Sequence, residues 1–192
     1  MSRRRVAVTG IGMVSPTGTT APECWNACLA GRAAVAPIPD EWLRWSAYQS
    51  TVWAPLPTVD FAAAGIAPLE AMRLDGAAML AVVAAREALV DAGLEASMVD
   101  AKRGIWRLAG IDCDRAGVFM GTAVGGITTL ITSQNSHLLT PLLPLESRGE
   151  PQAPDPASDA LDALLASLPK RFNPFAVSMI MPNSASATLG IR

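Results

Sequence analysis

The hydrophobic pattern at the start of the chain predicts a strand that ends in a tight turn. Val6–Val8 is a short apolar run, and two glycines, Gly10 and Gly12, follow it at an interval of two residues. Because glycine lacks a Cβ atom, this spacing lets the backbone approach another element closely. We therefore predict a strand over Arg5–Met13.

A helix is predicted directly after this turn. Thr20 and Glu23 have the spacing of a capping box, in which a hydroxyl and a carboxylate accept the first free N–H groups. Pro22 suits the first turn of a helix, where a backbone N–H has no partner. The helix is predicted to run to about Ala30 and to end at Gly31.

The most apolar segment of the chain predicts a buried helix over about Asp75–Ala92. Nearly all of its positions are Ala, Val, Leu or Met, and charged residues interrupt it at Arg86, Glu87 and Asp91. A helix without a polar face is expected to be enclosed on most sides. Gly93 is the glycine that commonly terminates a helix.

A second strand–turn–helix pattern follows in the middle of the chain. Gly117–Thr122 is predicted as a strand, Gly125 and Gly126 as its turn, and the next helix runs to about Leu138. The two predicted strands are far apart in the sequence, and two strands alone make a marginal sheet in water. We therefore expect the sheet to be incomplete without strands from another polypeptide.

The remaining segments predict mostly irregular structure. Residues 32–60 are rich in Pro and Trp and are predicted as a loop or short hairpin, and residues 68–74 as a helical turn. The proline-rich segment 140–157 is interpreted as an exposed loop insertion, followed by a short helix over 158–168. A last helix is predicted over 184–190.

Composition and charge exclude several kinds of partner. The 192-residue chain is 51% hydrophobic, with 15 basic and 17 acidic side chains. Nucleic-acid binding needs a basic face, so we expect no nucleic-acid partner. The longest apolar stretch, Ala77–Ala85, is too short to span a bilayer, and no signal peptide is evident. We expect one cytoplasmic domain over 1–192, with no membrane partner.

Few side chains in the sequence could carry chemistry. The three cysteines, Cys24, Cys28 and Cys113, make no disulfide framework, and His137 is the single histidine. A metal site would need further ligands beside Cys24 and Cys28, which are better explained as buried small apolar residues. No cysteine lies at a strand-to-helix elbow that would activate it. We predict no catalytic residue, no metal and no cofactor in this chain.

The first glycine turn has a nucleotide-binding alternative. A Gly-x-Gly after a strand also begins the Rossmann fingerprint, but the third glycine of that motif falls on Ser15 here. Pro16 follows, where a phosphate-binding helix should already donate N–H groups. An unrelated α/β nucleotide-binding module is therefore the weakest alternative that stays open.

The order and spacing of three sequence blocks point to a known family. The blocks are Val6–Gly18, Gly117–Gly126 and Asn173–Arg192. Together they closely resemble the amino-terminal half of the β-ketoacyl-acyl carrier protein synthases, condensing enzymes with a thiolase-like fold. The resemblance implies an α/β fold, the amino-terminal half of a layered αβαβα architecture. It also implies that the family's catalytic cysteine and two histidines would lie beyond Arg192.

The resemblance also implies substrate-binding positions and partners. In that family the second glycine turn and the segment near the dimer boundary border the acyl pocket, which corresponds here to Val124, Phe175, Ala176 and Ile180. Ala176 stands where many relatives carry a bulky aromatic residue, so the pocket is expected to be wider. The implied partners are acyl carrier protein, a complementing carboxyl-terminal ketosynthase half, and a dimer or higher assembly.

Two functions follow from the resemblance. In the first, the chain is the amino-terminal part of a ketosynthase for decarboxylative Claisen condensation of acyl and malonyl thioesters. It would be inactive alone and active with a complementing half. In the second, it is a non-catalytic partner similar to a chain-length factor, or a truncated fragment. Both fatty acid and polyketide pathways fit either function.

Overall fold

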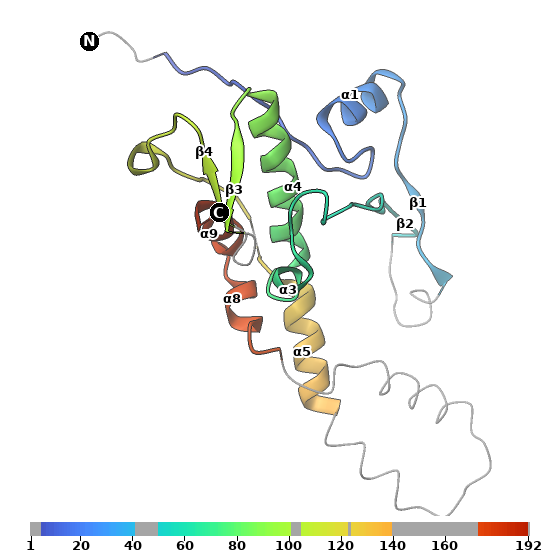
Figure 1. The fold of residues 1–192 in the computed structure, drawn as a ribbon. Helices are drawn as coiled ribbons and strands as arrows, with labels where there is room; N and C mark the ends of the chain where they lie inside the picture. The colour runs from blue at the N-terminus through green and yellow to red at the C-terminus, as the bar shows by residue number, and fades with distance from the viewer. Residues whose placement is uncertain (1–4, 41–49, 101–104, 123, 140–172, 192) are drawn as a thin grey trace, which may run out of the picture.

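The computed structural model describes residues 5–40, 50–100, 105–122, 124–139 and 173–191. These residues form a group of helices with two short hairpins (Figure 1). The helices are α1 (Ala21–Leu29), α3 (Pro68–Ala71), α4 (Gly76–Asp91), α5 (Ile127–Leu139), α8 (Ala176–Ile180) and α9 (Ser184–Ile191), with a 3-10 turn, η1, at Cys113–Arg115. The strands are β1 (Ala36–Pro37), β2 (Val52–Trp53), β3 (Ala96–Asp100) and β4 (Ile105–Leu108).

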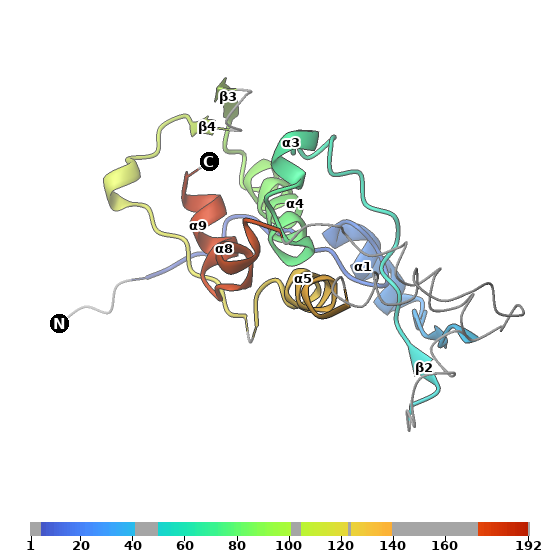
Figure 2. The same cartoon turned by 90° about the horizontal axis from the view of Figure 1, so that it is seen from below.

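Helix α4 is the centre of this arrangement. Helix α9 packs along it, and α5 packs against α8 (Figure 1, Figure 2). Asp75 caps α4 by accepting a hydrogen bond from the N–H of Ala77 (3.0 Å), and Gly93, with a φ of +68°, ends the helix as predicted. The buried side chains where these helices meet are Ala78, Val82, Ala176, Met179 and Ala185.

The prediction that α4 is enclosed on most sides is wrong for this chain. Ala78 and Val82 are its buried residues, most other side chains are half-buried, and Val90 is 75% exposed. The neighbours of α4 include α9, the N-terminal segment and the β3–β4 hairpin, whose Trp106 ring lies 3.7 Å from the Arg86 guanidinium. These elements leave much of the apolar surface of α4 uncovered, so the helix is not enclosed.

The prediction of two strands from the sequence is also wrong. Arg5–Met13 and Gly117–Thr122 join no sheet within the described residues. The sheets are instead two antiparallel hairpins. The β1–β2 hairpin confirms the prediction for 32–60, whereas the β3–β4 hairpin was not predicted. Because a strand is held by its ladder of hydrogen bonds, an apolar extended segment without a neighbouring strand stays unpaired.

Two glycines let the N-terminal segment lie directly on the backbone of α4. A Cβ atom at Gly10 would collide with the carbonyl oxygen of Ala88, and one at Gly12 with the carbonyl oxygen of Ala84. The close approach that the glycine spacing predicted is therefore confirmed, although the element approached is a helix. Any side chain at either position would push the segment away from α4.

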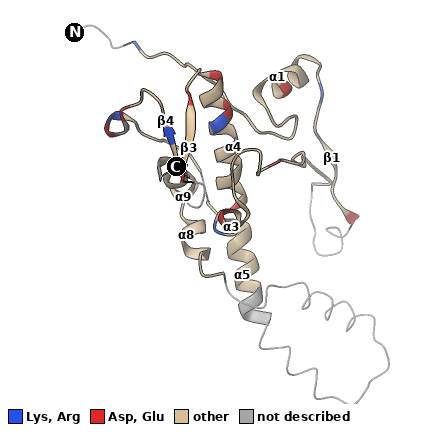
Figure 3. Cartoon of the chain, viewed as in Figure 1, with Lys and Arg blue, Asp and Glu red and all other residues tan. Residues whose placement is uncertain are grey.

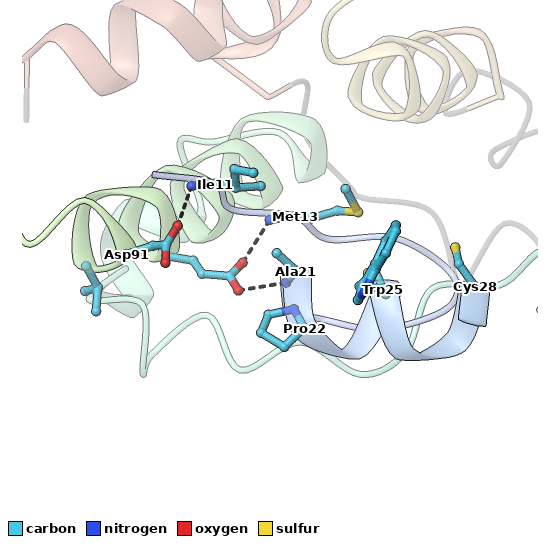
Figure 4. A pocket seen from close by; sticks show the side chains of 10 residues that line it. Ile11, Met13, Ala21, Pro22, Trp25, Cys28 and Asp91 are labelled. Atoms are coloured by element: carbon cyan, nitrogen blue, oxygen red, sulfur yellow. Dashed lines mark hydrogen bonds between the residues drawn. The ribbon is translucent and has the colours of Figure 1, made fainter. Parts of the chain in front are cut away.

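Two carboxylates of α4 act as acceptors for this segment (Figure 4). Asp91 Oδ2 accepts a hydrogen bond from the N–H of Ile11 (2.9 Å), and Glu87 Oε2 accepts one from the N–H of Met13 (2.8 Å). Glu87 Oε1 also accepts from the N–H of Ala21 (2.7 Å), at the start of α1. A single carboxylate therefore joins the N-terminal segment, α1 and α4.

The start of α1 agrees with the predicted capping box, with one shift. Thr20 Oγ1 accepts a hydrogen bond from the N–H of Glu23 (3.3 Å). The Glu23 carboxylate returns to Thr19 rather than Thr20, and it accepts from the Thr19 N–H (2.8 Å) and hydroxyl (3.1 Å). These hydrogen bonds, the one from the Thr19 N–H first, lower the pKa of Glu23.

We expect the start of α1 to loosen in acid because of Glu23. Its pKa in the folded chain lies below the ordinary 4.5, so its stabilisation is present above that value and is lost as pH falls through the lowered pKa. The protection of the Thr19 amide against hydrogen exchange should decrease with acidification. In the Glu23→Gln variant the protection should be low and nearly independent of pH. The same pH dependence in both proteins would contradict the prediction.

The remaining predictions have mixed outcomes. The insertion at 140–157 and the helix at 158–168 lie outside the described residues. Cys24 is buried, as predicted, at 3% exposure. Cys28 is exposed, against the prediction, and it lines an open cavity between α1 and α4. The last helix is confirmed as α9, and it is preceded by α8, which was not predicted.

Charge is sparse on the described residues. In Figure 3, acidic residues lie at the carboxyl-terminal end of α4, and Lys and Arg form no continuous face in this view. In the part of the chain that the structure describes, no helix combines the length and the apolar character needed to cross a bilayer.

Candidate functional site

The second glycine turn packs backbone to backbone against the carboxyl-terminal end of α8. A Cβ atom at Gly125 would lie 2.7 Å from the carbonyl oxygen of Met181 and 2.9 Å from that of Ile180. A Cβ atom at Gly126 would collide with the carbonyl oxygen of Met179, and the φ of Gly126 is +39°. Glycine is required at both positions, so the paired glycines fix the turn to α8.

Val124, which precedes this turn, lines an open cavity of about 460 Å³. Leu80 of α4 and Ile127 of α5 contribute apolar side chains to the same cavity, and Val124 is 52% exposed. Asp75 holds the two helices together, because its Oδ2 accepts a hydrogen bond from Thr129 Oγ1 (3.1 Å) while its Oδ1 caps α4. The cavity therefore has an apolar wall and one carboxylate at its edge.

A smaller cavity of about 180 Å³ lies beside the same turn. It is lined by residues of the extended segment before the turn, Met120 and Thr122, and by Met179 and Met181 at the end of α8. Methionine side chains adapt readily to irregular apolar shapes. The turn thus borders two cavities with different linings.

The other three predicted positions lie at or on α8, and none of them lines either cavity. Ile180 is half-buried at the end of α8 that meets the turn. Ala176 is fully buried at the opposite end, and Phe175 precedes it, with its ring 5.3 Å from the guanidinium carbon of Arg73. Neither Phe175 nor Ala176 lines either cavity. The structure brings the turn and Ile180 together and leaves the other two about one helical turn away.

Sequence reasoning missed Asp75, Leu80 and Ile127 at this site. Ile127 directly follows the glycine turn, so its position in the chain was a usable signal. Asp75 was visible as a helix start, but its bond to α5 depends on tertiary packing. Leu80 belongs to a segment that is apolar all round, so hydrophobic periodicity gives no reason to select it.

A further cavity, of about 650 Å³, lies at the other end of α4 (Figure 4). Ile11 and Met13 of the N-terminal segment, Trp25 of α1 and Val90 of α4 line it. All four side chains are at least 43% exposed, so the cavity is an open apolar groove. Its carboxylates, Glu87 and Asp91, are already hydrogen-bonded to backbone N–H groups.

Within the described residues, the reactive side chains form no arrangement typical of a catalytic or metal site. Cys24 Sγ lies 3.0 Å from Ser15 Oγ and donates a hydrogen bond to the carbonyl oxygen of Gly18 (3.3 Å). No carboxylate from the described part of the chain is bonded to it. Among the residues that the structure describes, no three His, Cys, Asp or Glu side chains are grouped as a metal site would require.

Comparison with known proteins decides the family. Residues 3–164 match the family model described as "Beta-ketoacyl synthase, N-terminal domain". The chain belongs to the β-ketoacyl synthase family. This assignment confirms the resemblance of the first two sequence blocks and excludes the unrelated nucleotide-binding module. The fold is accordingly α/β and thiolase-like, and the chain corresponds to the amino-terminal portion of a ketosynthase.

A 3-oxoacyl-[acyl-carrier-protein] synthase and a polyketide ketoacyl synthase both match this chain. It is 28% identical to the 3-oxoacyl-[acyl-carrier-protein] synthase 2 of Coxiella burnetii, over 100% of this chain and 36% of the relative. It is 35% identical to the tetracenomycin polyketide synthase ketoacyl synthase alpha subunit of Streptomyces glaucescens, over 67% of this chain and 27% of the relative. The chain thus spans about a third of the length of these relatives.

A solved structure supports the fold. The β-ketoacyl synthase from Burkholderia phymatum STM815 superimposes on 97% of this chain with a TM-score of 0.62 and 23% sequence identity. The matched region is 36% of that protein. The helices and the two extended segments of this chain therefore have the fold of the matched part of that ketosynthase.

Proposed function

We propose that this chain is the amino-terminal part of a ketosynthase that condenses acyl and malonyl thioesters carried on acyl carrier protein. The match of residues 3–164 to the ketosynthase amino-terminal domain carries the proposal. The chain supplies acyl-pocket and dimer-interface residues, and a complementing carboxyl-terminal half supplies the catalytic residues. The assembly is a dimer or larger and works in the cytoplasm, in fatty acid or polyketide synthesis.

The proposed chemistry divides between the two halves. A cysteine thiolate of the complementing half attacks the acyl thioester carbonyl, and the carrier thiolate leaves. Malonyl thioester then loses CO₂, and its enolate carbon forms a bond to the acyl carbonyl carbon, which releases the cysteine thiolate. Hydrogen bonds to the enolate oxygen stabilise this step. The contribution of the chain itself is to hold the acyl group, with Val124, Leu80 and Ile127 forming the apolar wall.

The proposal is tested by purifying the tagged chain from its native host and identifying what accompanies it by mass spectrometry. We expect a stoichiometric second polypeptide with a cysteine that gains an acyl group when acyl thioester is added. A stoichiometric partner without such a cysteine would instead favour the non-catalytic, chain-length-factor-like function. A folded chain that purifies alone would contradict a split ketosynthase.

The position of Val124 gives a second test in the acylated complex. Val124→Phe should fill part of the 460 Å³ cavity and lower kcat/KM for long acyl groups about tenfold relative to short ones. The control is Val177→Phe, since Val177 is 70% exposed on α8 and lines neither cavity. An equal effect of Val124→Phe on all acyl lengths would contradict its assignment to the acyl pocket.

A further inference from the structure

The carboxylate of Asp75 connects the start of α4 to the first turn of α5. Its Oδ1 accepts a hydrogen bond from the N–H of Ala77 (3.0 Å) and so caps α4. Its Oδ2 accepts a hydrogen bond from Thr129 Oγ1 (3.1 Å), and both side chains are half-buried. Hydrogen bonds to a charged acceptor are stronger than those between neutral groups. The two oxygens of Asp75 therefore have separate roles, since one holds its own helix and the other holds α5.

Apart from this hydrogen bond, α4 and α5 pack mainly against other helices. Helix α4 packs along α9, and α5 packs against α8 (Figure 1, Figure 2). The 460 Å³ cavity opens where α4 and α5 begin, and Asp75 and Thr129 line it together with Leu80, Val124 and Ile127. Within the described residues, little direct packing between the two helices therefore opposes a change in the width of this cavity.

The start of α5 is also held on its other side. Gly126 directly precedes α5, and its backbone lies so close to the carbonyl group of Met179 in α8 that no Cβ atom fits between them. Loss of the Asp75–Thr129 hydrogen bond would thus leave α5 attached to α8 and allow it to move relative to α4. The expected consequence is a shift of Ile127 relative to Leu80, on opposite sides of the cavity, without loss of the fold.

We infer that the Asp75–Thr129 hydrogen bond sets the width of the acyl pocket, and that this pair thereby selects straight acyl chains over branched ones. Asp75 and Thr129 are positioning residues in this inference, because they act through the wall residues Leu80 and Ile127. The inference rests on the proposed function, in which these residues and Val124 hold the acyl group. A methyl branch needs the two walls farther apart than a straight chain does, and one such group changes kcat/KM about tenfold in a pocket that resists it.

The test compares kcat/KM for octanoyl and isooctanoyl thioesters of acyl carrier protein, which have the same number of carbon atoms, in the assembly purified from the host. Thr129→Val removes the hydroxyl and keeps the branched shape of the side chain. Asp75→Ser keeps one oxygen to cap α4 and leaves none for Thr129. Each substitution should raise kcat/KM for the isooctanoyl group relative to the octanoyl group about tenfold. The double variant should raise it by the same factor, because both substitutions break one hydrogen bond.

Two further variants are the controls. Asp75→Asn keeps the oxygen that caps α4, and its amide group can donate a hydrogen bond to the Thr129 hydroxyl, so the ratio should stay near that of the unsubstituted assembly. Thr128→Val makes the same chemical change as Thr129→Val at a neighbour that lines the same cavity. The Thr128 hydroxyl forms no hydrogen bond within the described residues, so this variant should change the ratio much less.

The outcomes separate this inference from the proposed function. If Thr129→Val lowers kcat/KM for both acyl groups by the same factor, the hydrogen bond has a structural role alone, and the inference is overturned while the proposed function stands. An equal change in the ratio by Thr128→Val and Thr129→Val would overturn it as well, since the lining rather than the hydrogen bond would then set the ratio. Thr129→Val decides the question by itself if Asp75→Ser does not assemble. An assembly in which no cysteine takes up either acyl group would contradict the proposed function and this inference together.

Discussion

Replacing Gly12 with alanine is expected to separate the N-terminal segment from α4. A Cβ atom at this position collides with the carbonyl oxygen of Ala84 and lies 2.7 Å from the nitrogen of Ala88. Both are helix backbone atoms, so neither can rotate away. Relief requires moving the whole segment, which also breaks the hydrogen bonds from Ile11 and Met13 to the α4 carboxylates. We expect the free energy of unfolding to fall by about 3 kcal/mol.

Gly121→Ala is the matched control for this substitution. Gly121 also lies in an extended segment after a short apolar run, but a Cβ atom there meets no heavy atom within 4 Å. Both variants are unfolded with denaturant in the assembly purified from the host. The free energy of unfolding should be lower for Gly12→Ala than for Gly121→Ala by most of the predicted loss. If Gly12→Ala is as stable as Gly121→Ala, the N-terminal segment does not lie on α4 in solution.

Replacing Glu87 with alanine should have the second-largest effect. The Glu87 carboxylate accepts hydrogen bonds from the N–H groups of Met13 (2.8 Å) and Ala21 (2.7 Å). Hydrogen bonds to a charged acceptor are stronger than those between neutral groups, and Glu87 is half-buried. We expect a loss of about 2 kcal/mol in the free energy of unfolding. Hydrogen exchange should show faster opening at Met13 and at the start of α1 together.

Two further variants separate the contributions of the individual hydrogen bonds to stability. Glu87→Gln keeps one acceptor oxygen, so it should lose roughly half as much stability as Glu87→Ala. Asp91→Ala removes a single hydrogen bond, from the N–H of Ile11, and should leave the start of α1 unchanged. Opening at Met13 without opening at Ala21 in the Glu87→Ala variant would show that the carboxylate does not join the two segments.

The elements predicted correctly from the sequence are those with local signals. Helix α1 follows from Thr20 and Glu23, and α4 from its apolar run between Asp75 and Gly93, because capping and helix termination depend on neighbouring residues. The β3–β4 hairpin was missed because Ala96–Asp100 and Ile105–Leu108 show no clear alternation of apolar and polar side chains. Its pairing is a property of two segments together.

The candidate site was predicted in part for the same reason. The glycine turn and Val124 follow from their place in the chain, and the resemblance to ketosynthases pointed to them. The partners of that turn, Leu80 and the carbonyl oxygens at the end of α8, come from segments distant in the sequence. No local pattern specifies which face of an apolar helix lines a cavity, since that depends on where the other helices pack.

The sequence by itself determined the resemblance to the family, the bounds of α1, α4 and α9, and the two glycine turns, since each depends on residue identity at short spacing. Tertiary structure alone decided what those turns touch. Gly10 and Gly12 lie on α4, and Gly125 and Gly126 lie on α8, because only these helices bring backbone atoms close enough to exclude a Cβ atom. It also decided that the two apolar extended segments remain unpaired, because strand pairing requires a neighbouring strand that none of the described residues provides.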